Sequence, residues 1–367
     1  MKSSELAGIF SDFRRMVITF TIALLAGYGF LYMALPAPFL MGSLFGVWII
    51  GGIFPSIRPE LGVPRWFHVP VVLGLGVFIG ANFTSAMIEQ ASHWMTTVSI
   101  MIAVTLLVSI LGYGFLRRIR GYDPVMALLC SVPGGQAEAL VMAREMVDKD
   151  YVVALFHLIR VAVIFFSTPL LLAVLEGGEA VAVSNQRLLN MPGILDLTSG
   201  QILAFISLAI AGYGIARFLR LPMPHLLGPM GLSMAFHITG FVFIPRIHEF
   251  IMLAQLAIGG GVGARLAQVE LSSLLVYLRD GLLTSGIILL AYLLAALGIA
   301  HFTHAGFLSI WLAFVPGGLY EVTLLALIFG FDIAFIAFHH MVRVFLIFLT
   351  MPVLATWLKR QHHPSST

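Results

Sequence analysis

Long apolar stretches separated by short polar ones run through almost the whole chain. Several are as long as the roughly 20 residues that a helix needs to cross a hydrocarbon core about 30 Å thick. The first set of predicted spans lies at 16–35, 39–55, 69–84, 95–116 and 151–175. A second set follows in the same order and ends with a span at 333–357. The pattern predicts an all-α polytopic membrane protein with about ten transmembrane helices.

One further segment in each set, at 123–146 and at 306–328, is apolar but interrupted by Pro-Gly-Gly. Proline removes a backbone donor and glycine permits unusual dihedral angles, so the helices should break at Pro133 and at Pro316. In a membrane, non-helical backbone persists only where protein buries it or where it lines a water-filled cavity. We therefore expect both breaks to lie in the protein interior.

The two sets share residues at a constant spacing, which predicts an internal duplication. Five pairs are 183 residues apart: Pro133 and Pro316, Glu138 and Glu321, His157 and His340, Arg160 and Arg343, and Pro169 and Pro352. Small residues repeat in the same register, Gly76 and Gly80 at Gly259 and Gly263, and such pairs are typical of close helix packing.

The duplication defines the predicted domain organisation. We expect a cytoplasmic N-terminus at 1–15, a membrane repeat at 16–175, a linker at 176–200, a second membrane repeat at 201–357 and a cytoplasmic tail at 358–367. The polar N-terminus precedes a full-length span, so it is interpreted as leading into a retained first helix and not as a removed signal peptide.

Composition agrees with this assignment and excludes several other classes. Hydrophobic residues make up 60% of the chain and charged residues only 10%, against about a quarter in soluble proteins. The net charge of +3 reflects membrane topology and does not indicate nucleic-acid binding. The single cysteine, Cys130, excludes an internal disulfide and a multi-cysteine metal site.

The distribution of Lys and Arg bears on the orientation of the repeats. If the broken segment crosses the membrane, twelve of these residues fall on the side of the N-terminus and six on the other. If it enters and returns on one side, sixteen fall on the N-terminal side and only Arg187 and Arg246 opposite. Because cytoplasmic loops are rich in Lys and Arg, the count favours inverted repeats with both termini cytoplasmic, in a bacterial inner membrane.

The charged residues of the repeated segments are the strongest candidates for function. A carboxylate or a guanidinium group within the membrane costs several kcal/mol unless it is paired, neutralised or solvated. Two interpretations of Glu138 and Glu321 follow. Either they form structural salt bridges with Arg160 and Arg343, or these charged groups bind a ligand and couple its movement to that of an ion. In the second case a glutamate exchanges a proton or ligates a cation, and an arginine captures an anionic group.

Other residues could support such a site. The predicted substrate- or ion-binding residues are Pro133, Gly134, Gly135, Gln136, Glu138, His157, Arg160, Pro316, Gly317, Gly318, Tyr320, Glu321, Thr323, His340 and Arg343. Asp150 and Asp332 precede the last span of each repeat and are interpreted as helix caps. His339 is interpreted as a core histidine with satisfied hydrogen bonds. No spacing is typical of a metal site, and we expect no cofactor and no catalytic residue.

These motifs resemble a known family. The doubled Pro-Gly-Gly-x-x-Glu, the Leu-Pro-x-Pro at 35–38 and 221–224, and the His-x-x-Arg pairs are similar to the bacterial AbrB-duplication membrane family over both repeats. Its members are commonly labelled ammonia monooxygenase or AbrB family regulator. The sequence favours neither label literally, because it contains no soluble DNA-binding domain and no recognisable copper or iron ligand set.

A more distant resemblance concerns residues 131–169. Their layout is similar to the Pro-Gly-Gly segment of bile-acid/sodium symporters, in the cation:proton antiporter/anion transporter superfamily. The resemblance implies inverted five-helix repeats in which a discontinuous helix of each half crosses the membrane. The usual Ser-Asn after the glycines is replaced by Ala-Glu at 137–138, which favours proton coupling over a sodium site.

Together these observations predict a secondary transporter of a small solute, coupled to protons or to another cation, and not an enzyme. The arginines would bind such a solute if it is an anion. Its expected partners are the lipid bilayer and a small-molecule or ion ligand, and not nucleic acid. The sequence is compatible with a homo-oligomer but does not predict one. The alternatives are a membrane sensor or regulator that binds a ligand without moving it and, third, a membrane monooxygenase.

Overall fold

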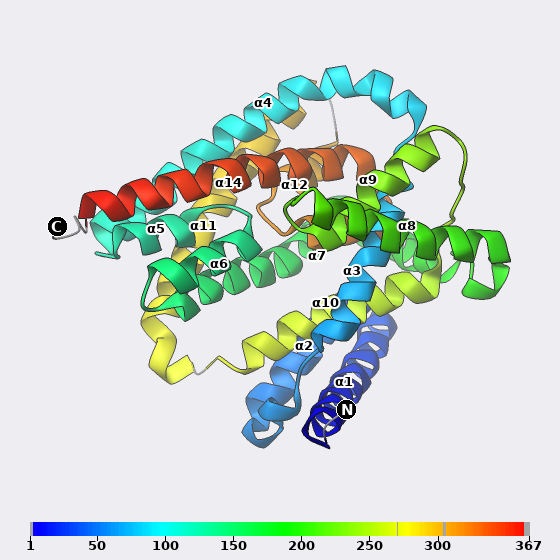
Figure 1. The fold of residues 1–367 in the computed structure, drawn as a ribbon, viewed down its shortest axis with the longest axis horizontal. Coiled ribbons are helices and arrows are strands. Elements are labelled where there is room, and N and C mark those ends of the chain that lie inside the picture. Colours follow the sequence, from blue (N-terminus) through cyan, green and yellow to red (C-terminus); the bar gives the residue numbers. More distant parts are fainter. Residues whose placement is uncertain (1–2, 270, 304–305, 363–367) are drawn as a thin grey trace. The chain divides into compact units, whose positions relative to one another are not determined.

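The chain is helical throughout the part that the computed structural model describes, residues 3–269, 271–303 and 306–362, where no strand occurs. Figure 1 allows the helices to be followed from α1 in blue to α14 in red. Seven helices among these residues are long and apolar enough to cross a membrane: Gly8–Tyr32, Ser92–Ile119, Asp150–Leu189, Ser199–Phe218, His248–Ala267, Leu275–Thr303 and Ile333–Gln361. The prediction of an all-α polytopic membrane protein is confirmed.

The helices form two compact units, and each unit contains segments from both halves of the sequence. Unit 1 consists of the described residues of 1–85, 165–270 and 324–331. Unit 2 consists of the described residues of 86–164, 271–323 and 332–367. The units therefore do not coincide with the two consecutive stretches 16–175 and 201–357.

Unit 1 is built from helices that pack in two matching patterns. It contains α1 (Ser3–Tyr32), α2 (Pro38–Ile53), a 3-10 turn (Pro55–Glu60), α3 (Arg65–Gly80), the second part of α7 (Asp150–Leu189), a 3-10 turn (Ile194–Asp196), α8 (Ser199–Phe218), α9 (Pro224–Ile238), α10 (His248–Ala267) and the end of α13 (Leu319–Phe329). α1 packs on α2 as α8 packs on α9, and α2 packs on α10 as α9 packs on α3.

The predicted spans at 39–55 and 69–84 exist as helices, but they are shorter than a membrane crossing. α2 and α3 have 16 residues each and α9 has 15. At 1.5 Å per residue, 16 residues extend only about 24 Å. More than half of the residues of α2 and of α3 are buried. These helices thus form the interior of unit 1.

Glycines allow these interior helices to approach one another closely. A Cβ atom on Gly76 would lie 2.7 Å from the carbonyl oxygen of Leu226, and one on Gly259 would lie 2.6 Å from that of Leu40. Gly80 and Gly263 also meet carbonyl oxygens of the facing helix. The expectation that these four glycines serve helix packing is therefore confirmed.

The two Leu-Pro-x-Pro motifs form turns with the same unusual backbone. Ala37 and Met223 precede the second proline of each motif with φ values of 46° and 45°. Ala34 and Arg220, just before each motif, have φ values of 52° and 54°. Left-handed conformations are uncommon outside glycine, and these four are the non-glycine examples among the described residues. Each turn leads directly into an interior helix, α2 or α9.

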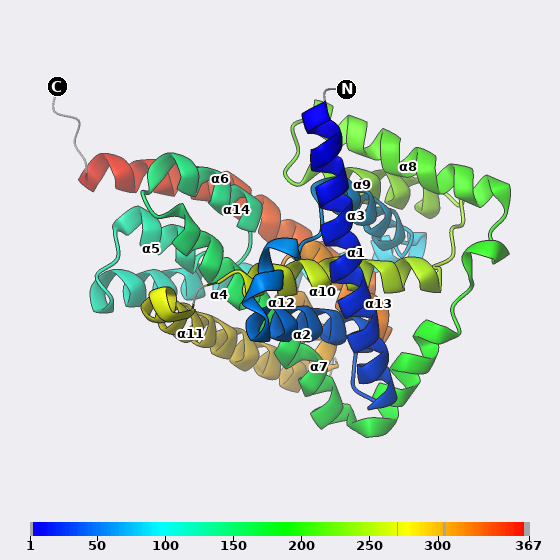
Figure 2. The same cartoon turned by 90° about the horizontal axis from the view of Figure 1, so that it is seen from below.

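Unit 2 contains the two predicted breaks. Its elements are α4 (Ser85–Gly114), a π-helical turn (Phe115–Ile119), α5 (Pro124–Ser131), α6 (Gln136–Met146), the first part of α7, α11 (Leu271–Thr303), α12 (Phe307–Phe314), the start of α13 and α14 (Ile333–His362). The helix is interrupted at 132–135 and again at 315–318, as predicted. α5 and α6 lie beside α14 both in Figure 1 and in the turned view of Figure 2.

The predicted linker at 176–200 is partly helical. α7 is interrupted at Gly177, where φ is 82° and ψ is 175°, close to the predicted end of the span at residue 175. Helix then resumes as far as Leu189. In this second part Ser184 donates a hydrogen bond to the carbonyl oxygen of Ile328, and Asn185 donates one to that of Leu35. The polar residues that make this stretch resemble a linker therefore bond the ends of other helices in unit 1.

The glycine contacts lead to a stability prediction. Gly76→Ala places a methyl group against the backbone of α9 and should lower the free energy of unfolding by about 1–3 kcal/mol. Gly214→Ala is the matched control because nothing lies within 4 Å of its added Cβ, and it should leave stability unchanged or slightly higher. Unfolding in detergent measures both, and equal stability of the two variants would contradict close packing at Gly76.

Candidate functional site

The first Pro-Gly-Gly segment forms two short helices joined at 132–135. Asp123 starts α5, since its side-chain oxygen accepts hydrogen bonds from the amides of Val125 (2.9 Å) and Met126 (3.2 Å). α6 begins after Gly135, which adopts φ 60° and ψ 37°. Gly134 has φ 121°, a value that side chains with a Cβ rarely adopt. The two glycines therefore provide the change of direction that the break requires.

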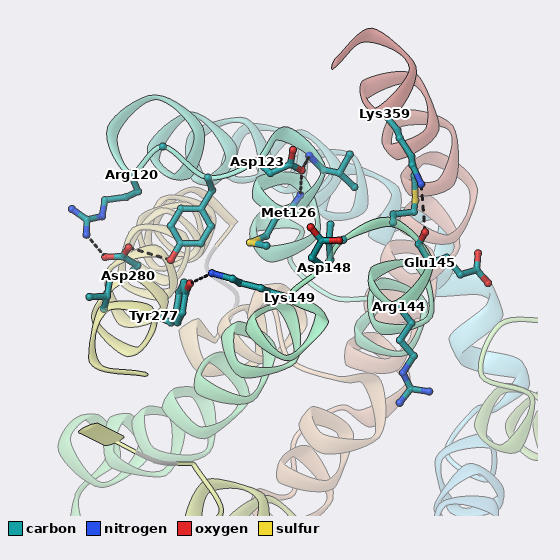
Figure 3. Close-up of a pocket in the computed structure, with 16 residues that line it drawn as sticks. Arg120, Asp123, Met126, Arg144, Glu145, Asp148, Lys149, Tyr277, Asp280 and Lys359 are labelled. Atoms are coloured by element: carbon teal, nitrogen blue, oxygen red, sulfur yellow. Dashed lines mark hydrogen bonds and ion pairs between the residues drawn. The ribbon is translucent and has the colours of Figure 1, made fainter. Parts of the chain in front are cut away.

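Both ends of this segment lie beside the same cavity, so α5 and α6 form a helical hairpin. The cavity has a volume of about 1000 Å³ and is lined by Arg120 to Asp123, Val125 and Met126 at the start of α5 and by Arg144 to Lys149 at the end of α6 and after it (Figure 3). The superfamily resemblance implies a broken helix that crosses the membrane. In unit 2 the two ends of the α5–α6 hairpin lie together at one cavity, an observation that bears on this expectation.

Arg160 and His157, on α7, bind the main chain of this break. Arg160 donates from Nη1 to the carbonyl oxygen of Val132 (2.6 Å) and from Nη2 to that of Cys130 (2.7 Å). The His157 ring nitrogen Nε2 donates to the carbonyl oxygen of Leu129 (3.0 Å). Arg160 is 1% exposed and His157 is 3% exposed. These contacts bond carbonyl oxygens at the end of α5 that the interrupted helix leaves without partners.

Arg343 and His340, on α14, repeat this arrangement at the second break. Arg343 donates to the carbonyl oxygens of Phe314 (2.7 Å) and Val315 (2.9 Å), and His340 Nε2 donates to that of Leu312 (2.8 Å). The carbonyl oxygens that the two histidines bind, those of Leu129 and Leu312, are 183 residues apart, as the histidines are. The same spacing separates the two valine carbonyl oxygens that the arginines bind.

These bonds bear on the two interpretations of the arginines. A guanidinium group at a helix C-terminus meets the negative end of the helix dipole, which offsets part of the cost of burying the charge. Hydrogen bonds from a charged donor are stronger than those between neutral groups. The contacts described for Arg160 and Arg343 thus give these residues a positioning role toward the breaks, which neither the salt-bridge nor the ligand hypothesis anticipated.

Each break packs against the last helix of the other half of the sequence. A Cβ on Gly134 would lie 3.2 Å from Ile347 Cδ1 and 3.6 Å from Arg343 Nε, both on α14. A Cβ on Gly317 would lie 3.7 Å from Ile164 Cδ1, on α7. Ile164 and Ile347 are again 183 residues apart. The two breaks, Pro133 and Pro316 included, are buried, as the sequence predicts.

The glutamates lie in the first turns of the helices that follow the breaks. Glu138, in α6, is partly exposed, but its Oε2 atom is buried and has no hydrogen-bond partner among the described residues. Glu321, in α13, is only 3% exposed, and a Cβ on Gly318 would overlap its carboxylate. A carboxylate in the first turn is favoured by the helix dipole. Both glutamates therefore lie directly beside a break.

The remaining predicted site residues have positions and contacts that belong to the helices themselves. Gln136 starts α6 and Tyr320 lies in the first turn of α13. Thr323 is fully buried and donates its hydroxyl hydrogen to the carbonyl oxygen of Leu319 (2.6 Å). Within the part of the chain that the structure describes, no three His, Cys, Asp or Glu side chains are grouped as a metal would require.

Two other interpretations can be compared with the structure. Asp332 accepts a hydrogen bond from the amide of Phe335 (3.0 Å), which confirms a helix cap. Asp150 begins α7 and lies 4.0 Å from Arg144. His339 donates from Nδ1 to the carbonyl oxygen of Phe335 (2.8 Å), and its Nε2 then accepts from the Thr97 hydroxyl (2.9 Å). The expectation of a satisfied core histidine is confirmed.

A buried carboxylate that sequence reasoning missed lies at the cavity. Asp280 is 1% exposed, forms ion pairs with Arg120 (2.9 Å) and Arg279 (3.3 Å), and accepts a hydrogen bond from the Tyr122 hydroxyl (3.2 Å). Burial and the nearby carboxylate raise the pKa of Tyr122 above its usual value, which keeps its proton on the phenol. In the sequence, Asp280 next to Arg279 looks like an exposed pair at the end of a span, and no local signal reveals its burial.

The arginine contacts generate a second stability prediction. Arg160→Met and Arg343→Met each leave two buried carbonyl oxygens without donors and should lower the free energy of unfolding by about 3 kcal/mol or more. Arg160→Lys should fall between, because an ammonium group cannot reproduce the fork of a guanidinium. Arg217→Met, at an exposed position, is the control, and thermal unfolding in detergent measures all four. A stable Arg160→Met would refute the positioning role.

Comparison with known proteins places this architecture in a family. Residues 44–359 match the family described as "Transition state regulatory protein AbrB". The chain is 29% identical over 340 residues to a protein of Escherichia coli (strain K12) named "Putative regulator AbrB", covering 92% of this chain and 94% of that protein. It is 22% identical over 341 residues to "Uncharacterized protein YhjN" of Bacillus subtilis (strain 168), covering 88% of each. The chain belongs to the AbrB family of membrane proteins.

Proposed function

We propose that this protein is a secondary transporter of a small hydrophilic solute, coupled to protons or to another cation, with its site at the two Pro-Gly-Gly breaks. The observation that carries the proposal is a pair of unsatisfied polar atoms at the first break. Glu138 Oε2 and Arg160 Nε are both buried without a hydrogen-bond partner in the described residues. Buried polar groups normally have partners, so an acceptor and a donor left open here suit a water, an ion or a polar ligand.

The proposal includes two inverted repeats. Matching arginine and histidine contacts at the breaks support the duplication, as do the two left-handed turns before α2 and α9. Broken helices at corresponding places in two inverted halves are the usual position of a transporter's substrate site. In such proteins one bundle moves against another, and a chain whose two units each draw on both repeats suits that mechanism.

The cavity shared by the two ends of the α5–α6 hairpin supports a re-entrant segment, and with it the inverted arrangement with cytoplasmic termini. Arg120, Arg144, Lys149 and Lys359 all line one cavity of unit 2. A crossing segment would put Arg120 and Lys359 on one side of the membrane and Arg144 and Lys149 on the other. With a returning segment they share a side, and the excess of Lys and Arg on that side supports its being cytoplasmic. The relatives from two bacteria suit a bacterial inner membrane.

In this proposal Glu138 and Glu321 are the coupling groups. Glu138 Oε2 is buried without a partner among the described residues, and such a carboxylate in the membrane is stabilised either by a proton or by a cation, so its occupancy follows the gradient of that ion. Arg160 and Arg343 fix the backbone of the breaks by their hydrogen bonds to carbonyl oxygens. Their fixed positive charges also balance the ionised glutamates. When the glutamates are protonated this positive charge is unbalanced, which would favour an anionic solute.

A sensor that binds a ligand without moving it is the second candidate. The relatives' names favour it, because the family and the Escherichia coli protein are both described as regulatory. The proposed site could serve either role, since binding is common to both and flux is not. We propose no enzymatic activity and no cofactor, because the break residues have structural and ion-binding chemistry without a nucleophile.

Glu138→Gln tests the coupling role. Glutamine resembles the protonated carboxyl group, so the variant should unfold at the same temperature as wild type, while proton-coupled flux in proteoliposomes is abolished. Flux would be followed with an internal pH dye while gradients of carboxylates, ammonium and sodium are applied. Glu179→Gln, an exposed carboxylate of unit 1, is the control and should retain flux.

Three outcomes separate the possibilities. Flux in wild type that is lost in Glu138→Gln supports the proposed transporter. A thermal shift by one of these ions without any flux identifies a sensor instead. A strongly destabilised Glu138→Gln protein would mean that the carboxylate is a structural partner, which contradicts its role as a coupling group.

A further inference from the structure

The cavity between the two ends of the α5–α6 hairpin has the properties of an aqueous space. At about 30 Å³ per molecule, a volume of about 1000 Å³ holds on the order of 30 waters. Charged side chains of the turn after α6, of α11 and of α14 line it, among them Lys149, Asp280 and Lys359. Figure 3 shows Lys149 and Asp148 in the space between the start of α5 and Tyr277 of α11. Such a lining excludes lipid and requires water.

The fixed charges at the cavity are divided between those that are engaged and those that are available. Asp123 is bonded by the amides of α5, and Asp280 is paired with Arg120 and Arg279. Lys149 donates only to the uncharged Tyr277 hydroxyl (3.1 Å), and Lys359 donates to the carbonyl oxygen of Glu145 (3.4 Å). Basic and acidic residues are equally numerous in the lining, which consists in part of Arg120, Arg144, Lys149 and Lys359 and of Asp123, Glu145, Asp148 and Asp280, so the cavity has no strong excess of either charge.

The inner end of the cavity is closed by apolar packing. Beyond Met126, the hairpin joins a buried cluster in which Leu129 and Ala139 are 0% exposed and Val132 is 7% exposed. The same cluster includes Ile347 of α14, against which the two glycines of the break pack. The cavity therefore ends about two helical turns before the break at the tip of the hairpin.

We propose that this cavity is the entrance through which a small hydrophilic solute or hydrated ion reaches the break, and that it opens on one side of the membrane only. This inference rests on the proposed function, because that function is what makes the break the binding site to which the entrance leads. The hairpin is the barrier between the entrance and the site. Its ends are bonded to α11 through Arg120 and Lys149 and to α14 through Glu145.

The sole cysteine of the chain makes a sharp test possible. Cys130 is fully buried, and alanine stands at the position 183 residues later, so Cys130→Ala provides a background without thiols. Into it Met126→Cys and Met146→Cys would be introduced singly, one at each end of the hairpin. A membrane-impermeant charged maleimide would then be applied to right-side-out and to inverted membrane vesicles.

Two controls fix the meaning of the labelling. Phe302→Cys lies at the far end of α11, about 38 Å from Tyr277 at 1.5 Å per residue, and should react from the opposite side. Ala139→Cys lies in the apolar cluster and should react only after denaturation. The expected result is that Met126→Cys and Met146→Cys both react from one common side, which Phe302→Cys does not share.

Each other outcome has a definite meaning. If Met126→Cys and Met146→Cys react from opposite sides, the segment crosses the membrane and the inference is wrong. If both are unreactive in native vesicles but react when denatured, the cavity is not an entrance. One-sided labelling without flux leaves the entrance intact and overturns transport, whereas flux without labelling overturns the entrance alone.

Discussion

Every backbone polar group inside a bilayer needs a partner within the protein, and this constraint determines the centre of unit 2. Pro133 and Pro316 each follow a helix of only eight residues, α5 or α12, whose last carbonyl oxygens have no amide to accept from. Arg160 and Arg343 supply the donors, and His157 and His340 supply one more each. The breaks exist because these four side chains make them tolerable.

That solution has an electrostatic consequence for the residues around it. A guanidinium group remains protonated even when buried, so each break contains a permanent positive charge. The carbonyl oxygens at the end of a helix balance only part of it. Glu138 and Glu321, one turn beyond each break, are the nearby groups whose charge can change. A structure that needs fixed cations to support its backbone thereby creates a place where the protonation of a carboxylate matters.

Much of this arrangement could be predicted from the sequence, because duplication repeats unusual residues at one spacing. The break positions, the cap at Asp332 and the packing glycines follow from local chemistry that any helix in lipid must obey. The partners of Arg160 could not be predicted, since bonds to main-chain oxygens of Cys130 and Val132 leave no trace in side-chain identity. The burial of Asp280 could not be predicted for a related reason, because it depends on the contact between α11 and the residues before α5.

The direction of the hairpin connects these local facts to transport. A helix that is broken and continues across the membrane exposes its break equally to both sides, whereas a hairpin that returns gives its tip one mouth and one sealed end. In unit 2 the charged cavity is the proposed mouth, and the apolar cluster around Ile347 closes its inner end. If the second repeat is inverted, its break at Pro316 faces the opposite way, and two hairpins with opposed mouths meet near the midplane. Alternating access would then release the packing of Gly134 against Ile347 and that of Gly317 against Ile164 in turn.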